Sequence, residues 1–180
     1  MVINGVSQGV FAKSSFSSIA IYGQEGNDLL QVDEDVKSID YLFGGLGNDV
    51  LNAGGGIGLL DGGAGIDILN AGEKSSILIG GEGADTLTGE NGSDLFIAGS
   101  INFGSQSTSE QTLASLLSAW TATDKNLKSR AAAVDKLLAG LVVNDGQKDV
   151  LHGDSGKNLY YLSAGDQLLG KEKGDITIVK

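Results

Sequence analysis

The sequence contains no cysteine, no proline and only one histidine among its 180 residues. Without cysteine the chain can form neither a disulfide framework nor a thiolate metal site, and one histidine is too few for a histidine-based zinc site. The absence of proline excludes a collagen-like helix. No apolar stretch approaches the roughly 20 residues that a membrane-spanning helix requires, so we expect no membrane span.

Basic side chains are also scarce, with 12 lysines and arginines against 23 aspartates and glutamates, which gives a formal net charge of −11. Such a chain repels nucleic-acid phosphates, so we expect no nucleic-acid partner and favour cations as ligands. The sequence has no P-loop and no dinucleotide-binding fingerprint, and its GxSxG-like segment at 5–9 has no evident triad partners. We therefore expect no enzymatic activity.

Glycine, by contrast, is abundant, with 29 residues that recur at regular intervals. Three segments match one template without gaps and at equal intervals, namely GGLGND at 44–49, GGAGID at 62–67 and GGEGAD at 80–85. Weaker copies between them halve the interval to a period of nine. Odd copies begin at residues 23, 44, 62 and 80, and even copies begin at 35, 53, 71 and 89. The first interval is longer by three, which we attribute to an insertion at 32–34.

Every copy carries a large apolar residue at its eighth position. These residues are Leu30, Leu42, Leu51, Leu60, Leu69, Leu78, Leu87 and Phe96. Six glycine-rich residues can form a tight turn and the next three a strand, so stacked copies would bury the eighth residues in one column. The sequence predicts a mainly β fold, a parallel β-roll or two-sheet β-solenoid with two copies per coil. Because alternate turns stack together, the odd copies form one edge, the odd edge, and the even copies form the even edge.

The pattern GGxGxDxUx resembles the calcium-binding RTX, or haemolysin-type, repeat of bacterial secreted proteins over about residues 23–97. The resemblance implies a β-roll that holds calcium ions between stacked turns. Calcium takes six to eight oxygen ligands, which a turn of this composition can supply from its carbonyls and its aspartate. The alternative is that these aspartates only cap tight turns.

By that resemblance, each ion is shared by two successive turns. One turn contributes its aspartate and the carbonyls at positions 2 and 4, and the next contributes its aspartate and the carbonyls at positions 1 and 3. The odd edge has every aspartate and would hold about three ions. The first ligand set would be Gly45, Gly47, Asp49, Gly62, Ala64 and Asp67, the second Gly63, Gly65, Asp67, Gly80, Glu82 and Asp85, and the third Gln24, Gly26, Asp28, Gly44, Leu46 and Asp49.

The even edge is incomplete, because only its first and last copies have an aspartate at the sixth position. These two residues, Asp94 and Asp40, are weaker metal candidates. Lys37 and Lys74 also lie in the turns of this edge. Each of these lysines is either an ammonium that partly replaces a divalent ion or an ordinary solvated side chain.

Helical periodicity replaces the period of nine at about residue 98. Within 105–123, Thr108 and Gln111 have capping-box spacing, and a second helix is expected from about Thr123 or Asp124 to Gly140. We expect this hairpin to pack on the sheet of the even copies, whose outward side chains are largely apolar. These side chains are Tyr41, Phe43, Leu59, Ile77, Ile79, Leu95 and Ile97. The alternative is that this face is a partner interface.

Four degenerate copies follow, beginning at residues 144, 153, 162 and 171. Their eighth positions would be Leu151, Tyr160, Leu169 and Ile178, and their sixth Asp149, Asn158, Gln167 and Ile176. We expect them to extend and cap the roll and to bind calcium weakly or not at all. The chain is thus expected to comprise a β-roll at 1–97, a helical hairpin insertion at 98–143 and degenerate repeats at 144–180.

These features predict a calcium-binding structural module that folds on calcium binding after secretion, within an extracellular or cell-surface bacterial protein. The resemblance also implies export by a type I secretion apparatus. Two other functions stay open. One is a C-terminal accessory module of a secreted enzyme, and the other is a surface adhesion or assembly unit that self-associates through Tyr41, Phe43, Ile77 and Ile79.

Overall fold

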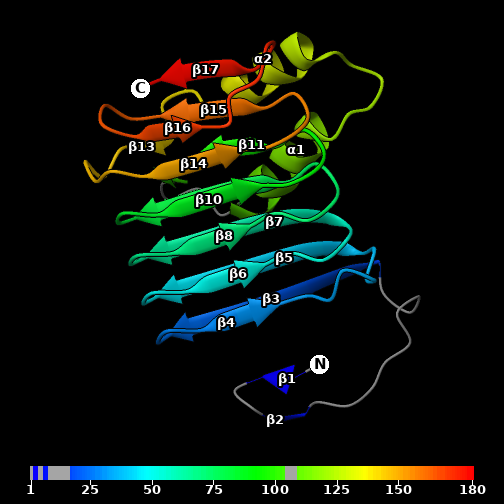
Figure 1. Ribbon diagram of the computed structural model, residues 1–180, viewed down its shortest axis with the longest axis vertical. Helices are drawn as coiled ribbons and strands as arrows, with labels where there is room; N and C mark the ends of the chain where they lie inside the picture. Colours follow the sequence, from blue (N-terminus) through cyan, green and yellow to red (C-terminus); the bar gives the residue numbers. More distant parts are fainter. Residues whose placement is uncertain (1, 4–5, 8–16, 104–108) are drawn as a thin grey trace.

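The computed structural model describes residues 2–3, 6–7, 17–103 and 109–180, and its main feature is two parallel sheets that face each other (Figure 1). The even sheet consists of β3 (Ser18–Glu25), β5 (Ile39–Leu46), β7 (Ile57–Ala64), β9 (Ile77–Glu82), β11 (Leu95–Ile97), β15 (Leu159–Leu162) and β17 (Ile176–Val179). The odd sheet consists of β4 (Leu29–Gln31), β6 (Val50–Asn52), β8 (Ile68–Asn70), β10 (Thr86–Gly89), β14 (Val150–Gly153) and β16 (Gln167–Leu169). Separately, β1 (Val2–Ile3) and β2 (Val6–Ser7) pair antiparallel.

The strand register confirms that two copies make one coil. Leu51 pairs with Leu69 in the odd sheet and Leu60 pairs with Leu78 in the even sheet, so equivalent positions of successive coils lie side by side. All eight predicted eighth-position residues are buried in one core cluster between the sheets. A column of apolar residues, one per strand, therefore holds the two sheets together, and the predicted parallel β-roll is confirmed.

The roll begins one strand earlier than the repeat pattern indicated. Strand β3 pairs with β5 so that Ile21 lies beside Leu42, and Ile19 and Ile21 pack against the core. Ile21 precedes Leu30 by one period of nine, a signal that the missing glycines obscured. Because Leu30 pairs with Leu51, β3 and β4 are displaced equally from their partners. The extra length of this coil therefore lies between β4 and β5, where the insertion at 32–34 was placed.

Turns on the odd edge depend on glycine at their second and fourth positions. Gly45 and Gly47 have φ of 111° and 126°, and the same values recur closely in the next two turns. Gln24 occupies the second position of the first turn with φ of 79°, and it is the one non-glycine with positive φ among the described residues. A side chain in this region costs roughly 1–2 kcal/mol.

Replacing Gln24 with glycine should therefore stabilise the roll. Relief of the backbone strain exceeds the entropy that an extra glycine loses on folding, so we expect a gain of about 0.5–1 kcal/mol. Chemical denaturation of the calcium-loaded protein would measure it. Gly45→Ala is the matched opposite change, because a Cβ there would collide with the main chain of Gln24, and it should destabilise the roll clearly. A destabilised Gln24→Gly variant would contradict this account.

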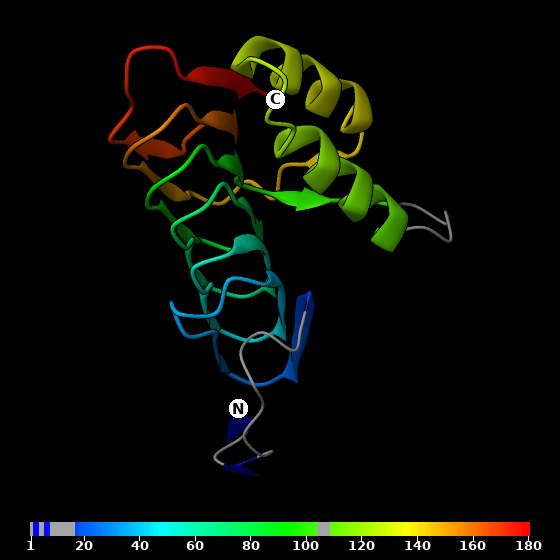
Figure 2. The same ribbon diagram turned by 90° about the vertical axis from the view of Figure 1, so that its right-hand side faces the viewer.

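A helical hairpin covers part of the outer face of the even sheet (Figure 2). It consists of α1 (Ser109–Trp120) and α2 (Leu127–Leu137). The two helices and seven outward side chains of the sheet form a second core, whose buried sheet members are Leu59, Ile77, Ile79, Leu95, Ile97, Leu159 and Tyr161. This confirms the predicted packing, and it removes Ile77 and Ile79 from any partner interface. Neither helix of the described residues is long and apolar enough to cross a membrane.

The second helix begins later than predicted. Asn126, rather than Thr123 or Asp124, is its N-cap, because the Asn126 side chain accepts a hydrogen bond of 3.0 Å from the amide of Ser129. The helix also ends earlier than predicted, because Leu138 is its C-cap and Gly140, with φ of 73°, lies two residues beyond that cap. Thr108, the predicted capping residue of the first helix, lies outside the described residues.

The degenerate copies continue both sheets, but the predicted frame of the last two is wrong by one position. Leu151 pairs with Leu168 and Tyr160 pairs with Thr177, so these partners occupy the eighth positions instead of Leu169 and Ile178. The sixth positions accordingly hold Asp166 and Asp175, because each accepts the ladder hydrogen bond of its coil. Each of these coils is shorter than a repeat coil by a single residue, and a strict period of nine therefore misplaced them.

Candidate metal centre on the odd edge

The sixth-position aspartates of the odd edge form a hydrogen-bonded ladder along the stack. In each rung an aspartate Oδ1 accepts the amide N–H of the aspartate one coil earlier. Asp49 accepts from Asp28 and Asp67 accepts from Asp49, both at 2.7 Å, and Asp85 accepts from Asp67 at 2.9 Å. This side-chain ladder fixes the carboxylates at one spacing and orients them alike.

The second carboxylate oxygen of each rung lacks a partner. Among the described residues, the aspartates whose buried Oδ2 accepts no hydrogen bond are Asp28, Asp49, Asp67, Asp85, Asp94 and Asp149. Asp67 is completely buried and Asp49 and Asp85 are 1% exposed. Burying a carboxylate oxygen without a hydrogen-bond donor costs free energy. The unpartnered oxygens therefore indicate that a positively charged group binds beside them. An aspartate that only capped a turn would have no need of such a group.

Four of these oxygens, those of Asp28, Asp49, Asp67 and Asp85, lie close to a main-chain carbonyl of the following coil. A Cβ built on Gly62 would lie 2.5 Å from both Asp67 Oδ2 and the carbonyl oxygen of Gly80. The same cradle recurs at Gly23 and Gly44, where a side chain larger than that of glycine would collide with the two oxygens. The two oxygens at each cradle belong to the same predicted ligand set, and this arrangement fits a calcium ion.

Burial makes these carboxylates hard to ionise without a cation. Desolvation raises the pKa of Asp67 to about 6, and the charge of Asp49 adds to the effect. Desolvation likewise raises the pKa of Asp85 to about 7, with contributions from Asp149, Asp67 and Asp145. In each case the ladder hydrogen bond opposes the shift without cancelling it. A divalent ion would relieve both the desolvation and the repulsion.

The residues of the three predicted ligand sets lie in stacked turns. Gln24, Gly45 and Gly63 are side by side in register, as are Leu46 and Ala64. Within the described part of the chain, no three acidic or histidine side chains converge on a point that could hold a metal. The predicted sets each have only two carboxylates, so main-chain carbonyls would supply most ligands.

On the even edge the two aspartates differ from each other. Asp40 has both oxygens paired, with the Ser38 hydroxyl at 2.8 Å and the Gly54 amide at 3.0 Å. Asp94 retains an unpartnered Oδ2, and burial raises its pKa to about 7. Lys37 Nζ lies 2.8 Å from the carboxylate of Glu73 in a half-exposed ion pair. This lysine thus behaves as a solvated side chain.

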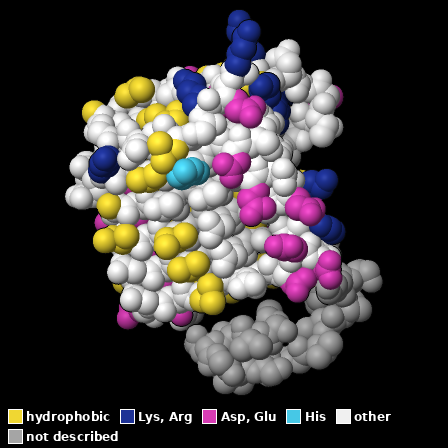
Figure 3. All heavy atoms as spheres, viewed as in Figure 1, with side chains coloured by type: hydrophobic (Ala, Val, Ile, Leu, Met, Phe, Trp, Pro, Cys, Tyr) yellow, Lys and Arg dark blue, Asp and Glu magenta, His cyan; other side chains and the backbone are white. Residues whose placement is uncertain are grey.

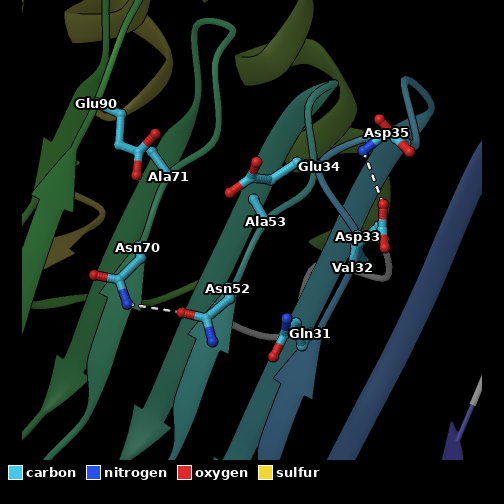
Figure 4. Close-up of a pocket in the computed structure, with 10 residues that line it drawn as sticks. All are labelled: Gln31, Val32, Asp33, Glu34, Asp35, Asn52, Ala53, Asn70, Ala71 and Glu90. Carbon is cyan, nitrogen blue, oxygen red and sulfur yellow. Dashed lines mark hydrogen bonds between the residues drawn. The ribbon is translucent and has the colours of Figure 1, made fainter.

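A hollow lies at the corner between the odd sheet and the even edge (Figure 4). Asn70 donates a hydrogen bond of 2.7 Å to Asn52 along its wall, and Glu34 and Glu90 extend over a floor of small residues. Acidic side chains gather at the same side of the molecule, whereas apolar side chains are scattered over the rest of this face (Figure 3). The inserted residues at 32–34 build part of this corner.

The C-terminal copies continue the carboxylate ladder of the odd edge. Asp149 continues the odd ladder, because its Oδ1 accepts the amide of Asp85 at 2.8 Å, and Asp166 continues it further. The Oδ2 of Asp166 already accepts a hydrogen bond of 2.6 Å from the Ser163 amide. The Oδ2 of Asp175 likewise accepts one from the Glu172 amide. The row of unpartnered oxygens thus extends to Asp149 and ends there. The regular recurrence of aspartate at a slightly shortened interval was the available signal.

Stacked parallel coils with a glycine-rich, carboxylate-lined edge define a calcium-binding β-roll, and comparison with known families agrees. Residues 38–60 and 61–99 match the family of the RTX calcium-binding nonapeptide repeat in four copies. These residues, which extend from the end of the first even turn through β11, are RTX repeats, as the GGxGxD template indicated. No curated protein and no solved structure matches the chain.

Proposed function

We propose that the protein is a structural module in which calcium binding completes the folding of the β-roll, with about three ions in the ligand sets of the odd edge. The observation that carries the proposal is the row of buried Oδ2 atoms without hydrogen-bond donors, of which those of Asp28, Asp49, Asp67 and Asp85 lie beside a carbonyl of the next coil. This row runs through the segment that matches the RTX repeats.

The chain's own residues supply the opposing free energies. In the absence of a cation, the stacked carboxylates repel one another, and the glycine-rich turns lose much conformational entropy on folding. The ladder holds each aspartate so that one oxygen is fixed and the other remains available to an ion. Asp49 and Asp67 would each serve two sites. Three calcium ions would reduce the net charge from −11 to −5, and their binding energy would become folding energy.

The same thermodynamics favours a role outside the cell. Weak extracellular modules bind calcium at about 10⁻⁴–10⁻³ M, whereas cytosolic sensors respond to much lower concentrations. A chain of this kind stays unfolded where calcium is low and folds where it is abundant. We therefore place the module in a secreted or surface protein, exported unfolded by a type I apparatus, with a mechanical rather than a catalytic role.

The test is a calcium titration of the EDTA-stripped protein, followed by far-ultraviolet circular dichroism, with magnesium as the control. We expect a cooperative gain of β signal with calcium and little change with magnesium, because magnesium demands smaller, near-octahedral sites. A stripped protein that is already fully folded and indifferent to calcium would contradict the proposal. The apolar column and the helices would then suffice for folding.

A further inference from the structure

The helical insertion interrupts the odd edge at a position where the carboxylate ladder continues. Thr86 in β10 pairs on one side with Ile68 of the preceding coil and on the other with Val150 in β14, so the whole insertion lies between two neighbouring strands. At the base of the insertion, β12 (Ser100–Ile101) pairs antiparallel with β13 (Val142–Val143). We call the interval between the turns at 80–85 and 144–149 the seam.

The seam preserves the oxygen arrangement of the ordinary intervals, although residues from both ends of the insertion now build it. A Cβ on Gly80 would lie 2.6 Å from Asp85 Oδ2 and 2.5 Å from the carbonyl oxygen of Ala98. Ala98 is the last residue before the insertion leaves the roll, and it takes the place of a first-position glycine. Across the seam Asp149 is 1% exposed, and its Oδ2 also lacks a donor.

A third carboxylate strengthens the negative potential of the seam. In the ordinary intervals the fourth-position glycine donates to a main-chain carbonyl, as Gly65 does to Glu82 at 2.7 Å. At the seam Gly83 instead donates to the carboxylate of Asp145 at 2.6 Å. Both carboxylate oxygens of Asp145 already accept a hydrogen bond, one from Gly83 and one from the Gln147 amide. Asp145 therefore adds negative charge to the seam but no free ligand atom.

The outer rim of the seam faces open space. Nothing lies within 4 Å of a Cβ built on Gly146, which holds the third position of the 144–149 turn. A hollow of about 400 Å³ opens here. It is lined by Ala64, Gly65, Glu82, Gly83, Asp145 and Gln147. Water could enter this space and complete the coordination of an ion.

We propose that the seam is a further calcium site, in which Asp85 and the carbonyls of the 80–85 turn are joined by the Ala98 carbonyl and by Asp149. An ion held there joins the two ends of the insertion, and so couples the repeats to the helical hairpin and the C-terminal coils. Because water from the adjoining hollow completes the coordination, the seam fills at a higher calcium concentration than the three sites of the repeats. This inference rests on the proposed function.

The test compares Asp149→Asn with the matched control Asp166→Asn in the full chain, using native mass spectrometry to count bound calcium. Asparagine retains the Oδ1 acceptor of the ladder, and Asp166 has no unpartnered oxygen. We expect Asp149→Asn to bind one ion fewer than wild type and Asp166→Asn to bind the same number. An unchanged count in Asp149→Asn, with calcium-dependent folding intact, would overturn the seam site alone. A wild-type chain that binds no calcium would overturn the proposed function as well.

Hydrogen exchange of the wild-type protein provides a test that needs no variant. The amide of Val150 donates to the Asp85 carbonyl across the seam, and the amide of Ile68 donates to the Asp49 carbonyl within the repeats. At calcium ten times the dissociation constant of the seam, exchange of the Val150 amide should slow about tenfold. The calcium midpoint for Val150 should be higher than that for Ile68. Coincident midpoints, or a Val150 amide indifferent to calcium, would contradict the proposal.

Discussion

Replacing Asp67 with asparagine should stabilise the calcium-free roll and weaken the calcium-loaded one. Burial raises the pKa of Asp67 from 3.8 to about 6, so at pH 7 the folded state bears a cost of ionisation that the unfolded state does not. A neutral amide removes this cost, which is on the order of 1–3 kcal/mol. With calcium present, the same change removes a ligand from two proposed sites, and the calcium midpoint of folding should rise at least ~10-fold.

The two opposite effects distinguish an ion ligand from a turn cap. Asparagine keeps the Oδ1 that accepts the Asp49 amide at 2.7 Å, so a purely capping aspartate would tolerate the exchange with little change in either state. Asp28→Asn is the graded control, because Asp28 belongs to one proposed site rather than two. Urea unfolding with excess calcium would measure the loaded state, and refolding with EDTA by a stabilising osmolyte such as TMAO would measure the calcium-free state. Equal stability changes in the two conditions would exclude Asp67 as a calcium ligand.

The sequence alone predicted the roll because its repeat is strict where stacking is tight. Gly45 and Gly47 must adopt positive φ against the preceding coil, and Leu51 must fill the space between two sheets. Each requirement permits few residue types, so the period remained visible. The row of aspartates on the odd edge could be predicted for the same reason, because a regular coil places its sixth positions in one row.

The frame of the C-terminal coils and the unpartnered oxygens could not be predicted, because they depend on contacts that a fixed sequence period does not describe. The coils after the insertion are shorter than the repeat coils, so Asp166 and Asp175 fell out of frame. Asp149 was placed correctly, but its position beside Asp85 depends on how the insertion closes, which only the three-dimensional structure shows. Which carboxylate oxygens remain unpartnered is likewise a matter of local geometry, as Asp40 and Asp94 illustrate.

Replacing Trp120 with alanine should release the helical hairpin from the even sheet. Trp120 is fully buried, its indole N–H donates to the Ser93 carbonyl at 2.8 Å, and the Arg130 guanidinium lies 4.6 Å from its ring. Removing a buried tryptophan typically costs about 3–5 kcal/mol. The loss would expose the apolar face that includes Ile77 and Ile79. We therefore expect lower stability together with calcium-independent self-association, visible by light scattering.

Trp120→Phe is the matched control, because phenylalanine keeps most of the apolar bulk and loses only the hydrogen bond to Ser93. Loss of this hydrogen bond should lower the stability by about 1 kcal/mol, in addition to the cost of a small packing defect. The protein should remain monomeric. The odd edge lies across the roll from this contact, so the calcium midpoint of the repeats should change little in either variant. A soluble, monomeric Trp120→Ala protein would show that the hairpin is not what shields the even sheet.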